Sequence, residues 1–327
     1  MDLLQLFKNK TIYWVSDSDL DGIGSIIVGK YYLDSVCKKI TIYSTAERDL
    51  PDFDFEEANK SDYILFTDIA PKSLDFHNQI NSKNNIFIFD HHASSRQELG
   101  ELDNYYFTDL KCGAKIFFDS LTENIRVKKT IYQFVELVDI YDRFVTSSNL
   151  WKNAKALSNI MYGYVDWKLA KYHTDLEKHT QFINKQLEKF DKGNSFYFTQ
   201  LETVLATKAE QKEQTNFKKA LDNLQFFEDE SQNKYATFKV VSKLSIVSHL
   251  LLQHLGDKVN YLIGYTTYDP TNTKVSIRSN GSFNCTTISD IWKPKGIQCG
   301  GHPQAVGFEC KTKQEAEDII NGKMKLI

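Results

Sequence analysis

Four short apolar runs in the first 90 residues place the strongest constraint on how this 327-residue chain can fold. They are rich in β-branched and aromatic residues, which favours strands, and they span residues 11–15, 39–43, 63–67 and 86–89. The first two runs are separated by a segment with apolar residues at helical spacing. Strands and helices that alternate at this spacing predict an α/β domain, a doubly wound parallel sheet with helices on both faces. The runs are almost wholly apolar, as expected for strands buried on both faces.

Acidic residues and a histidine pair follow three of these runs. They are Asp17, Asp19 and Asp21 after the first, Asp68 after the third, and Asp90, His91 and His92 after the fourth. Parallel strands end at one edge of a sheet, so we expect these groups to meet in one crevice. Clustered carboxylates repel one another unless a cation neutralises them, and carboxylate and imidazole suit divalent transition metals. Turn chemistry explains any one of these acids alone, but it does not explain the whole set.

This set resembles the DHH phosphoesterase superfamily, which is named for its Asp-His-His motif. Residues 16–22 resemble the first motif of that family, residues 66–68 the second, and residues 89–92 the third. The fourth motif is a lone aspartate after a helix. Asp142 is the preferred candidate for it, and Asp139 is the competing one.

Two details qualify the match to the family motifs. An aromatic residue often stands before the fourth-motif aspartate and another two places after it, as Tyr141 and Phe144 do around Asp142. Many members carry a histidine upstream of the paired aspartates in the first motif, and this sequence has none there. Asp17 stands two places before Asp19 instead, as in RecJ-like members, which leaves its ligand role open and could shift the metal preference.

Small residues begin a predicted helix between the third and fourth motifs, at Cys112-Gly113-Ala114. Such a start could let a phosphate approach backbone N–H groups, or it could be an ordinary helix start, and both alternatives stay open. We expect Cys112 to be a small buried residue rather than a nucleophile.

The second half of the chain is predicted to form a separate, smaller domain. Residues 153 to about 190 carry apolar residues at helical spacing and are expected to close the first domain, residues 1–190. Residues 191–194, Asp-Lys-Gly-Asn, are the best linker candidate, and residues 195–327 follow as the second domain. We expect an α/β domain with a mixed sheet there, with strands at residues 195–203, 235–241, 259–265 and 274–279 and a helix at 245–255.

Gly300-Gly301-His302 is the main signal in this second domain. Paired glycines before a histidine let the backbone approach a ligand closely, although a turn also explains them when they stand alone. The segment looks like the Gly-Gly-His motif of the DHH-associated substrate-binding domain, and residues 276–279 resemble the strand before that motif. The resemblance implies that Arg278 grips a phosphate or stacks on a base, and that His302 adds a hydrogen bond to the same ligand.

The resemblance implies a metal-dependent phosphodiesterase with two divalent cations, Mn²⁺ first and Mg²⁺ or Co²⁺ as alternatives. The implied metal ligands are Asp17, Asp19, Asp21, Asp68, His91 and Asp142, with Asp68 as the bridging one. His92 would stabilise charge on the phosphate, and Asp90 would orient the neighbouring imidazole. Arg278, Gly300, Gly301 and His302 would hold the substrate.

The net charge of the chain narrows the range of possible substrates. A formal net charge of −3 argues against a long basic groove for duplex nucleic acid. Short single-stranded substrates are favoured: oligoribonucleotides of a few residues, 3′-phosphoadenosine 5′-phosphate, or cyclic dinucleotides and their linear products. The alternatives are a RecJ-like single-strand exonuclease and a catalytically inactive nucleotide-binding or scaffold homologue, which the missing first-motif histidine favours. The Gly-Gly-His segment points away from an inorganic pyrophosphatase, which shares the metal motifs.

The cysteine content and the hydropathy of the chain indicate the cellular compartment of the protein. The five cysteines include no Cys-x-x-Cys, which favours a reducing, intracellular compartment. No apolar run reaches the roughly 18 residues of a membrane span, and the N-terminus lacks the features of a signal peptide. We therefore expect a cytoplasmic protein with no membrane partner. Its assembly is left open, with a homodimer as one option.

Overall fold

The computed structural model divides the chain into two compact units, Met1–Thr207 and Lys208–Ile327, and each is considered by itself. The boundary falls within helix α10 (Gln200–Asp222), whereas the sequence predicts a linker at residues 191–194. The residues that the structure describes are 2–46, 50, 52–71, 73–80, 85–165, 170, 173–193, 195–229, 231–269, 272–292, 294, 296–312 and 314–315.

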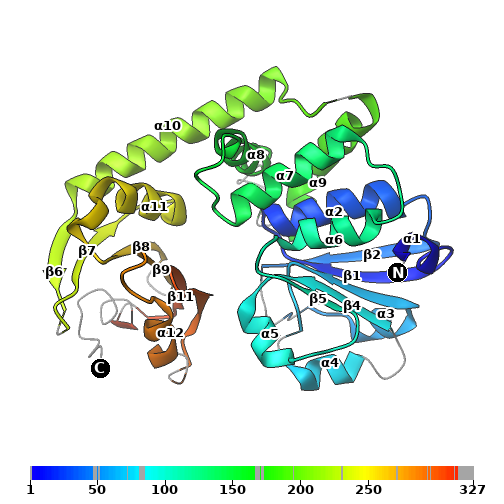
Figure 1. Ribbon diagram of the computed structural model, residues 1–327, viewed down its shortest axis with the longest axis horizontal. Coiled ribbons are helices and arrows are strands. Elements are labelled where there is room, and N and C mark those ends of the chain that lie inside the picture. The colour runs from blue at the N-terminus through cyan, green and yellow to red at the C-terminus, as the bar shows by residue number, and fades with distance from the viewer. Residues whose placement is uncertain are drawn as a thin grey trace. The chain divides into compact units, whose positions relative to one another are not determined.

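The first unit is built on a five-stranded parallel sheet with the order β2-β1-β3-β4-β5 (Figure 1). Its strands are β1 (Thr11–Ser16), β2 (Lys39–Ser44), β3 (Tyr63–Thr67), β4 (Asn85–Asp90) and β5 (Tyr105–Phe107). The first four confirm the predicted strands, while the three residues of β5 are too few to be recognised from their pattern. Strands β1, β3 and β4, which the acidic residues follow, are consecutive in the sheet, so their carboxyl ends lie side by side.

Helices cover both faces of this sheet, as the sequence predicts (Figure 1). One layer packs with Trp14, Leu65 and Phe89, and it consists of α1 (Leu3–Leu6), α2 (Leu20–Leu33), α6 (Gly113–Thr122), α7 (Lys129–Asp142), α8 (Trp151–Gly163) and α9 (Asp175–Lys192). The other layer packs with the alternate strand residues Val15, Phe66 and Ile88, and it consists of α3 (Phe55–Lys60), α4 (Leu74–Ile80) and α5 (Ala93–Leu99). The two hydrophobic cores explain why the central positions of β1, β3 and β4 are apolar on both faces.

The second unit contains a six-stranded mixed sheet with the order β10-β11-β9-β8-β7-β6. Its strands are β6 (Gln225–Glu228), β7 (Lys234–Lys239), β8 (Tyr261–Asp269), β9 (Asn272–Ser279), β10 (Gln298–His302) and β11 (Ala305–Cys310). Only β7 and β8 pair in parallel among them. The helices α11 (Leu244–Leu255) and α12 (Thr286–Trp292) and the 3₁₀ turn η2 (Gly256–Lys258) complete the unit. The smaller α/β domain with a mixed sheet is thus confirmed.

The prediction of a strand at residues 195–203 is wrong, because helix α10 begins at Gln200. A reciprocal pair of hydrogen bonds starts this helix. The backbone N–H of Glu202 donates to Thr199 Oγ1 (3.3 Å), and the backbone N–H of Thr199 donates to Glu202 Oε2 (2.7 Å). This is a capping box, a Thr-x-x-Glu signal that outweighs the short alternation of apolar residues before it.

Within the described part of the chain, no helix combines the length and the apolar character needed to cross a membrane.

Candidate metal centre

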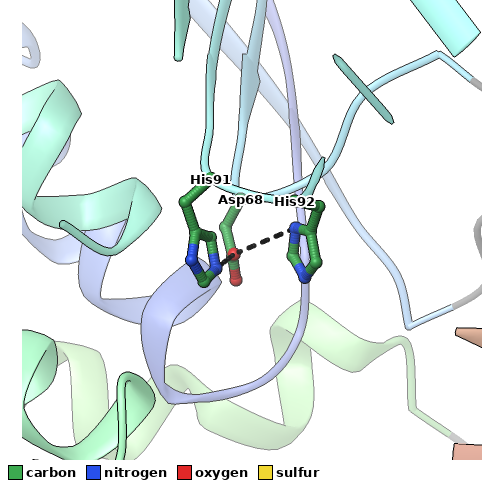
Figure 2. A group of neighbouring side chains, drawn as sticks. All are labelled: Asp68, His91 and His92. Atoms are coloured by element: carbon green, nitrogen blue, oxygen red, sulfur yellow. Dashed lines mark ion pairs between the residues drawn. The ribbon is translucent and has the colours of Figure 1, made fainter. Parts of the chain in front are cut away.

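Asp68, His91 and Asp142 meet at the carboxyl end of the parallel sheet. His91 Nε2 lies 3.4 Å from Asp68 Oδ1 and 3.4 Å from Asp142 Oδ2. Asp68 directly follows β3, His91 directly follows β4, and Asp142 is the last residue of α7. Figure 2 shows Asp68 between the rings of His91 and His92, which come from the neighbouring strand end. The parallel topology therefore brings Asp68 and His91 together, and the end of α7 adds Asp142.

The facing atoms of these three residues are buried and lack hydrogen bonds. Asp68 Oδ1, His91 Nε2 and Asp142 Oδ2 have no hydrogen-bond partner among the residues that the structure describes. Buried polar atoms are normally hydrogen-bonded, so three such atoms that face one another call for a ligand. Carboxylate oxygen and imidazole nitrogen suit a divalent transition metal, and a cation would also neutralise the carboxylates. The residues present therefore fit the metal centre of the DHH superfamily.

Two groups of possible ligand atoms share His91. One consists of Asp68, His91 and His92, and the other of Asp21, His91 and Asp142; within each, the ligand atoms lie within 4.8 Å of one another. The second group consists wholly of implied metal ligands, whereas Nδ1 of His92 in the first group lies 2.7 Å from Asp90 Oδ1. Asp68 Oδ1 is also 4.0 Å from His92 Nδ1, which places this carboxylate between the two rings.

Burial dominates the electrostatics of the centre. It raises the pKa of Asp68 well above the usual range, and the negative charges of Asp21 and Asp19 raise it further. The pKa of Asp142 is raised well above the usual range by the same causes, burial first and then the charges of Asp21 and Asp19. Burial and the neighbouring His92 lower the pKa of His91, which favours the neutral imidazole that binds metals. A bound cation would reverse the trend for the carboxyls by stabilising their ionised forms.

The backbone at Asp68 is unusual and depends on a glycine beside it. Asp68 adopts a left-handed conformation with φ +59°, which aspartate tolerates better than most residues, and its N–H donates to the carbonyl of Phe89 (2.8 Å). Gly113, at the start of α6, packs directly against it. A Cβ atom at Gly113 would lie 2.8 Å from Asp68 Cα and 2.9 Å from Asp68 Cβ, so a glycine is required there. The sequence shows this glycine but not what it packs against.

Asp21 joins the first motif to the start of α6. Its Oδ2 accepts a hydrogen bond from the N–H of Gly113 (2.6 Å), and its Oδ1 accepts one from the N–H of Ala114 (2.7 Å). The N–H of Cys112 donates to Asp139 Oδ1 (2.8 Å). Carboxylates thus occupy these N–H groups, and the structure favours an ordinary helix start over the phosphate site. Asp21 Oδ2 also lies 3.8 Å from His91 Nε2, so this side chain is part of the cluster.

We expect Asp21→Ala to lower the free energy of unfolding by about 2–4 kcal/mol, because two buried N–H groups would lose a charged acceptor. Asp21→Asn keeps one carboxamide oxygen as an acceptor and should cost less. Urea unfolding of the metal-free protein would measure both changes. Equal stability of Asp21→Ala and the unmodified protein would contradict a role for Asp21 in holding α6.

Asp142 and Asp139, the two candidates for the fourth motif, have different contacts in the structure. Asp139 accepts hydrogen bonds from Arg143 Nε (3.0 Å, to Oδ1) and Nη2 (2.8 Å, to Oδ2), in addition to the one from Cys112. Asp142 faces His91 instead. The structure therefore places the preferred candidate at the cluster and gives the competing residue a role in packing α6 against α7.

Asp17 and Asp19 lie in the loop that follows β1. Asp17 Oδ1 accepts hydrogen bonds from the N–H groups of Ser18 and Asp19, and Asp19 Oδ1 accepts them from Asp21 (2.8 Å) and Gly22 (3.2 Å) at the start of α2. Burial and the charge of Asp19 raise the pKa of Asp17 to about 7. Neither residue belongs to the two groups of ligand atoms within the described residues. Both are near enough for their charges to raise the pKa of Asp68.

Asp90 fixes the orientation of His92. Asp90 Oδ1 lies 2.7 Å from His92 Nδ1 and accepts hydrogen bonds from the backbone N–H groups of His91 (2.9 Å) and His92 (3.3 Å). Burial alone would raise the pKa of Asp90, but the attraction of His92 and the hydrogen bond from its ring lower it below the usual value. The ionised Asp90 can therefore hold a proton on Nδ1 of His92 and direct the other side of the ring away from itself.

The residues of the Gly-Gly-His segment lie in β10, and Arg278 lies in β9. Strand β11 pairs with both, with Ala305 opposite His302 on one side and opposite Arg278 on the other. Gly301 has φ +151°, and a Cβ atom there would lie 2.0 Å from the carbonyl oxygen of Ala305, so only glycine fits. Gly300 is opposite Gly307. The side chain of His302 lies outside the part that the structure describes.

Tyr162 is a residue near the centre that the sequence does not reveal. Burial, and then the negative charge of Asp19, raise the pKa of its hydroxyl, with smaller contributions from Tyr141 and Asp17. Helix α8 therefore runs close to the loop that carries Asp17 and Asp19. No motif marks this tyrosine in the sequence.

Comparison with known proteins bears on the family and the fold of the chain. Residues 11–140 match the DHH family, N-terminal domain. No curated protein matches the chain.

Several solved structures share the fold. A DHH domain from a member of the S1p family of ribosomal proteins has a TM-score of 0.66 at 11% identity, over 98% of this chain and 87% of that one. RecJ from Thermus thermophilus in complex with Mn²⁺ has a TM-score of 0.57 at 14% identity, over 99% of this chain; the chain spans 53% of that RecJ. The pGpG-specific phosphodiesterase PggH from Vibrio cholerae has a TM-score of 0.52 at 12% identity, over 95% of this chain and 97% of that one.

Proposed function

We propose that this protein is a metal-dependent phosphodiesterase that hydrolyses short oligonucleotides or small dinucleotides to mononucleotides. The observation that carries the proposal is the convergence of three buried atoms without hydrogen bonds, on Asp68, His91 and Asp142, at the end of a parallel sheet. The family match of residues 11–140 supports it. So does the fold shared with a Mn²⁺-bound RecJ and with a pGpG-specific phosphodiesterase.

Two divalent cations are proposed as cofactors, with Mn²⁺ preferred and Mg²⁺ or Co²⁺ as alternatives. The proposed ligands are Asp17, Asp19, Asp21, Asp68, His91 and Asp142. A carboxylate oxygen has two lone pairs, so the hydrogen bonds that Asp17, Asp19 and Asp21 accept leave room for a metal bond. When bound, such cations supply Lewis acidity and a water molecule of lowered pKa.

Side chains of the protein are proposed to stabilise the charge that develops on the phosphate. Asp90 holds the proton on Nδ1 of His92 and stabilises positive charge on that ring. His92 can then donate from Nε2 to a non-bridging phosphate oxygen and stabilise the charge that develops there. Asp68 and His91 are buried, as is the Oδ2 atom of Asp142, which limits the access of water to these atoms.

In the second unit, Arg278, Gly300, Gly301 and His302 are proposed to bind the substrate. A guanidinium in β9 suits a phosphate or the face of a base. The glycines of β10 leave backbone accessible to a ligand, because neither carries a side chain.

Turnover of oligonucleotides of increasing length tests this proposal. With Mn²⁺ present, we expect the purified protein to release mononucleotides from strands of two to five nucleotides, and the rate per strand should fall as length increases. A rate that rises with length would support the RecJ-like exonuclease alternative instead. No hydrolysis at any length, combined with less than one bound Mn²⁺ per chain, would favour an inactive binding or scaffold protein.

A further inference from the structure

Three aromatic side chains cluster directly beside Asp142, and the proposed hydrolysis does not use them. They are Tyr141, Phe144 and Trp151, referred to below as the aromatic trio. The rings of Tyr141 and Trp151 are stacked, with centroids 6.0 Å apart and planes 10° apart. Phe144 is tilted against both, 5.1 Å from Trp151 and 6.2 Å from Tyr141.

The aromatic trio is only partly buried. Tyr141 and Trp151 pack against the hydrophobic core of the first unit, yet all three side chains keep an intermediate exposure to solvent. Tyr141 and Phe144 flank Asp142 in the chain, and the carboxylate of Asp142 faces His91. The aromatic trio is therefore half-buried and, through Tyr141 and Phe144, lies within two residues of a side chain of the metal cluster.

The backbone at Phe144 is in a strained conformation. Helix α7 ends in a Schellman motif, in which the N–H of Phe144 donates to the carbonyl of Tyr141 (3.1 Å) and the N–H of Val145 donates to that of Ile140 (3.0 Å). Phe144 occupies the left-handed position of this motif with φ +54°. Glycine is usual there, because a residue with a Cβ atom is strained in this conformation. Strained positions of this kind cluster at sites that bind ligands.

Helix α8 links the aromatic trio to the neighbourhood of the first motif. It begins with Trp151, and near its other end Tyr162 lies within the electrostatic influence of Asp19 and Asp17. The helix that carries one ring of the aromatic trio therefore also borders the loop of the first motif. This position fits a substrate whose phosphate lies among the carboxylates.

We propose that the aromatic trio stacks on a nucleobase of the substrate, next to the phosphate that the metal centre holds. This inference rests on the proposed function, and it specifies that the substrate must carry a base close to the scissile bond. Aromatic rings stack on every base, so the site would distinguish a base from no base rather than one base from another. Cyclic or linear sugar phosphates without a base would bind poorly.

Equilibrium binding tests the inference without turnover. Isothermal titration with Mn²⁺ present would compare adenosine 5′-monophosphate with ribose 5-phosphate, which carries the same phosphate and sugar. We expect the unmodified protein to bind the nucleotide at least roughly tenfold more tightly, which corresponds to about 1.4 kcal/mol. Trp151→Ala should reduce this ratio to about two or less, and Trp151→Phe, which keeps a ring, should restore most of it.

Phe144→Gly provides an independent variant that is not expected to unfold the protein. Glycine relieves the left-handed strain at this position while it removes the ring. The ratio of the two affinities should fall without a matching loss of thermal stability. Tyr132→Ala is the matched control, since Tyr132 is an exposed aromatic residue on the same helix α7, and it should leave the ratio unchanged.

The possible results separate this inference from the proposed function. Equal binding of the two ligands by the unmodified protein, or a ratio that survives both Trp151→Ala and Phe144→Gly, would overturn the inference. A ratio that survives them but is lost in Arg278→Ala would place the base in the second unit and would also overturn it. A ratio that depends on the aromatic trio, in a protein that hydrolyses no oligonucleotide, would uphold the base site and contradict the proposed hydrolysis.

Discussion

Replacing Asp68 with asparagine should lower Mn²⁺-dependent hydrolysis of a dinucleotide by roughly a thousandfold or more. Asp68 Oδ1 is 3.4 Å from His91 Nε2 and 4.0 Å from His92 Nδ1, the most central position in the cluster. Charge stabilisation by a catalytic metal is worth several kcal/mol, and each 1.4 kcal/mol is a factor of ten in rate. Asparagine keeps the size of the side chain but removes the charge that a cation needs.

The matched control for this variant is Asp75→Asn. Asp75 is an exposed aspartate on α4, in the helix layer on the other face of the sheet, so its substitution removes the same charge from a residue outside the cluster. We expect Asp75→Asn to keep full activity. Both proteins should be assayed at the same concentration after circular dichroism has verified their folding. A folded Asp68→Asn protein with at least one tenth of the normal rate would rule out this centre as the site of hydrolysis.

The second large effect concerns the stability of the metal-free protein, which should fall as the pH rises from about 6.5 to 8. Burial raises the pKa of Asp17 to about 7, and burial together with neighbouring carboxylates raises those of Asp68 and Asp142 well above the usual range. In the unfolded chain, aspartate has a pKa of about 3.9 and is ionised throughout this range. The folded state therefore binds more protons, and its stability is lost as the pH rises through the raised pKa values.

Buried histidines act in the opposite direction, but only at lower pH. Burial lowers the pKa of His91, and it lowers the pKa of His179 and His249 to about 4, so these groups favour unfolding where unfolded histidine takes up a proton, below about pH 6.5. Above that pH, the raised pKa values of Asp17, Asp68 and Asp142 determine how stability changes with pH. Each carboxyl that stays protonated contributes a fall of about 1.4 kcal/mol per pH unit.

Mn²⁺ should remove this loss of stability. A cation binds the ionised carboxylates of the folded protein, and a ligand present at one hundred times its dissociation constant adds about 2.7 kcal/mol. Thermal unfolding in buffers of pH 6.5, 7.2 and 8.0, with chelator or with ~1 mM Mn²⁺ (that excess for a dissociation constant of about 10 µM), would measure both effects. The double variant Asp68→Asn, Asp142→Asn should show a flatter pH dependence and little response to Mn²⁺. An unmodified protein that gains no stability from Mn²⁺ at pH 8 would contradict the metal centre.

The sheet of the first unit could be predicted because its central strands β1, β3 and β4 are buried on both faces. A short apolar run such as Tyr63–Thr67, which an acidic residue ends abruptly, favours a strand over a helix. The convergence of Asp68 and His91 followed from the rule that parallel strands end at one edge, without any knowledge of strand order. That β1, β3 and β4 are consecutive came only from the structure.

Other features depend on contacts that a sequence does not display. Residues 195–199 alternate like a strand, but the capping box between Thr199 and Glu202 starts a helix. Asp21 was expected only as a metal ligand, and its hydrogen bonds to α6, 92 and 93 residues away, reveal a structural role as well. The strain at Phe144 is a property of the backbone. Such features arise where tertiary packing outweighs local preference.

The most direct test of the central claim is an anomalous difference map from a crystal soaked in MnCl₂. A metal centre formed by the strand ends predicts strong Mn²⁺ peaks in contact with Asp68 Oδ1, His91 Nε2 and Asp142 Oδ2, the three buried atoms that lack hydrogen bonds. A well-measured map with no peak at these atoms, from protein that is otherwise folded as described, would contradict the account.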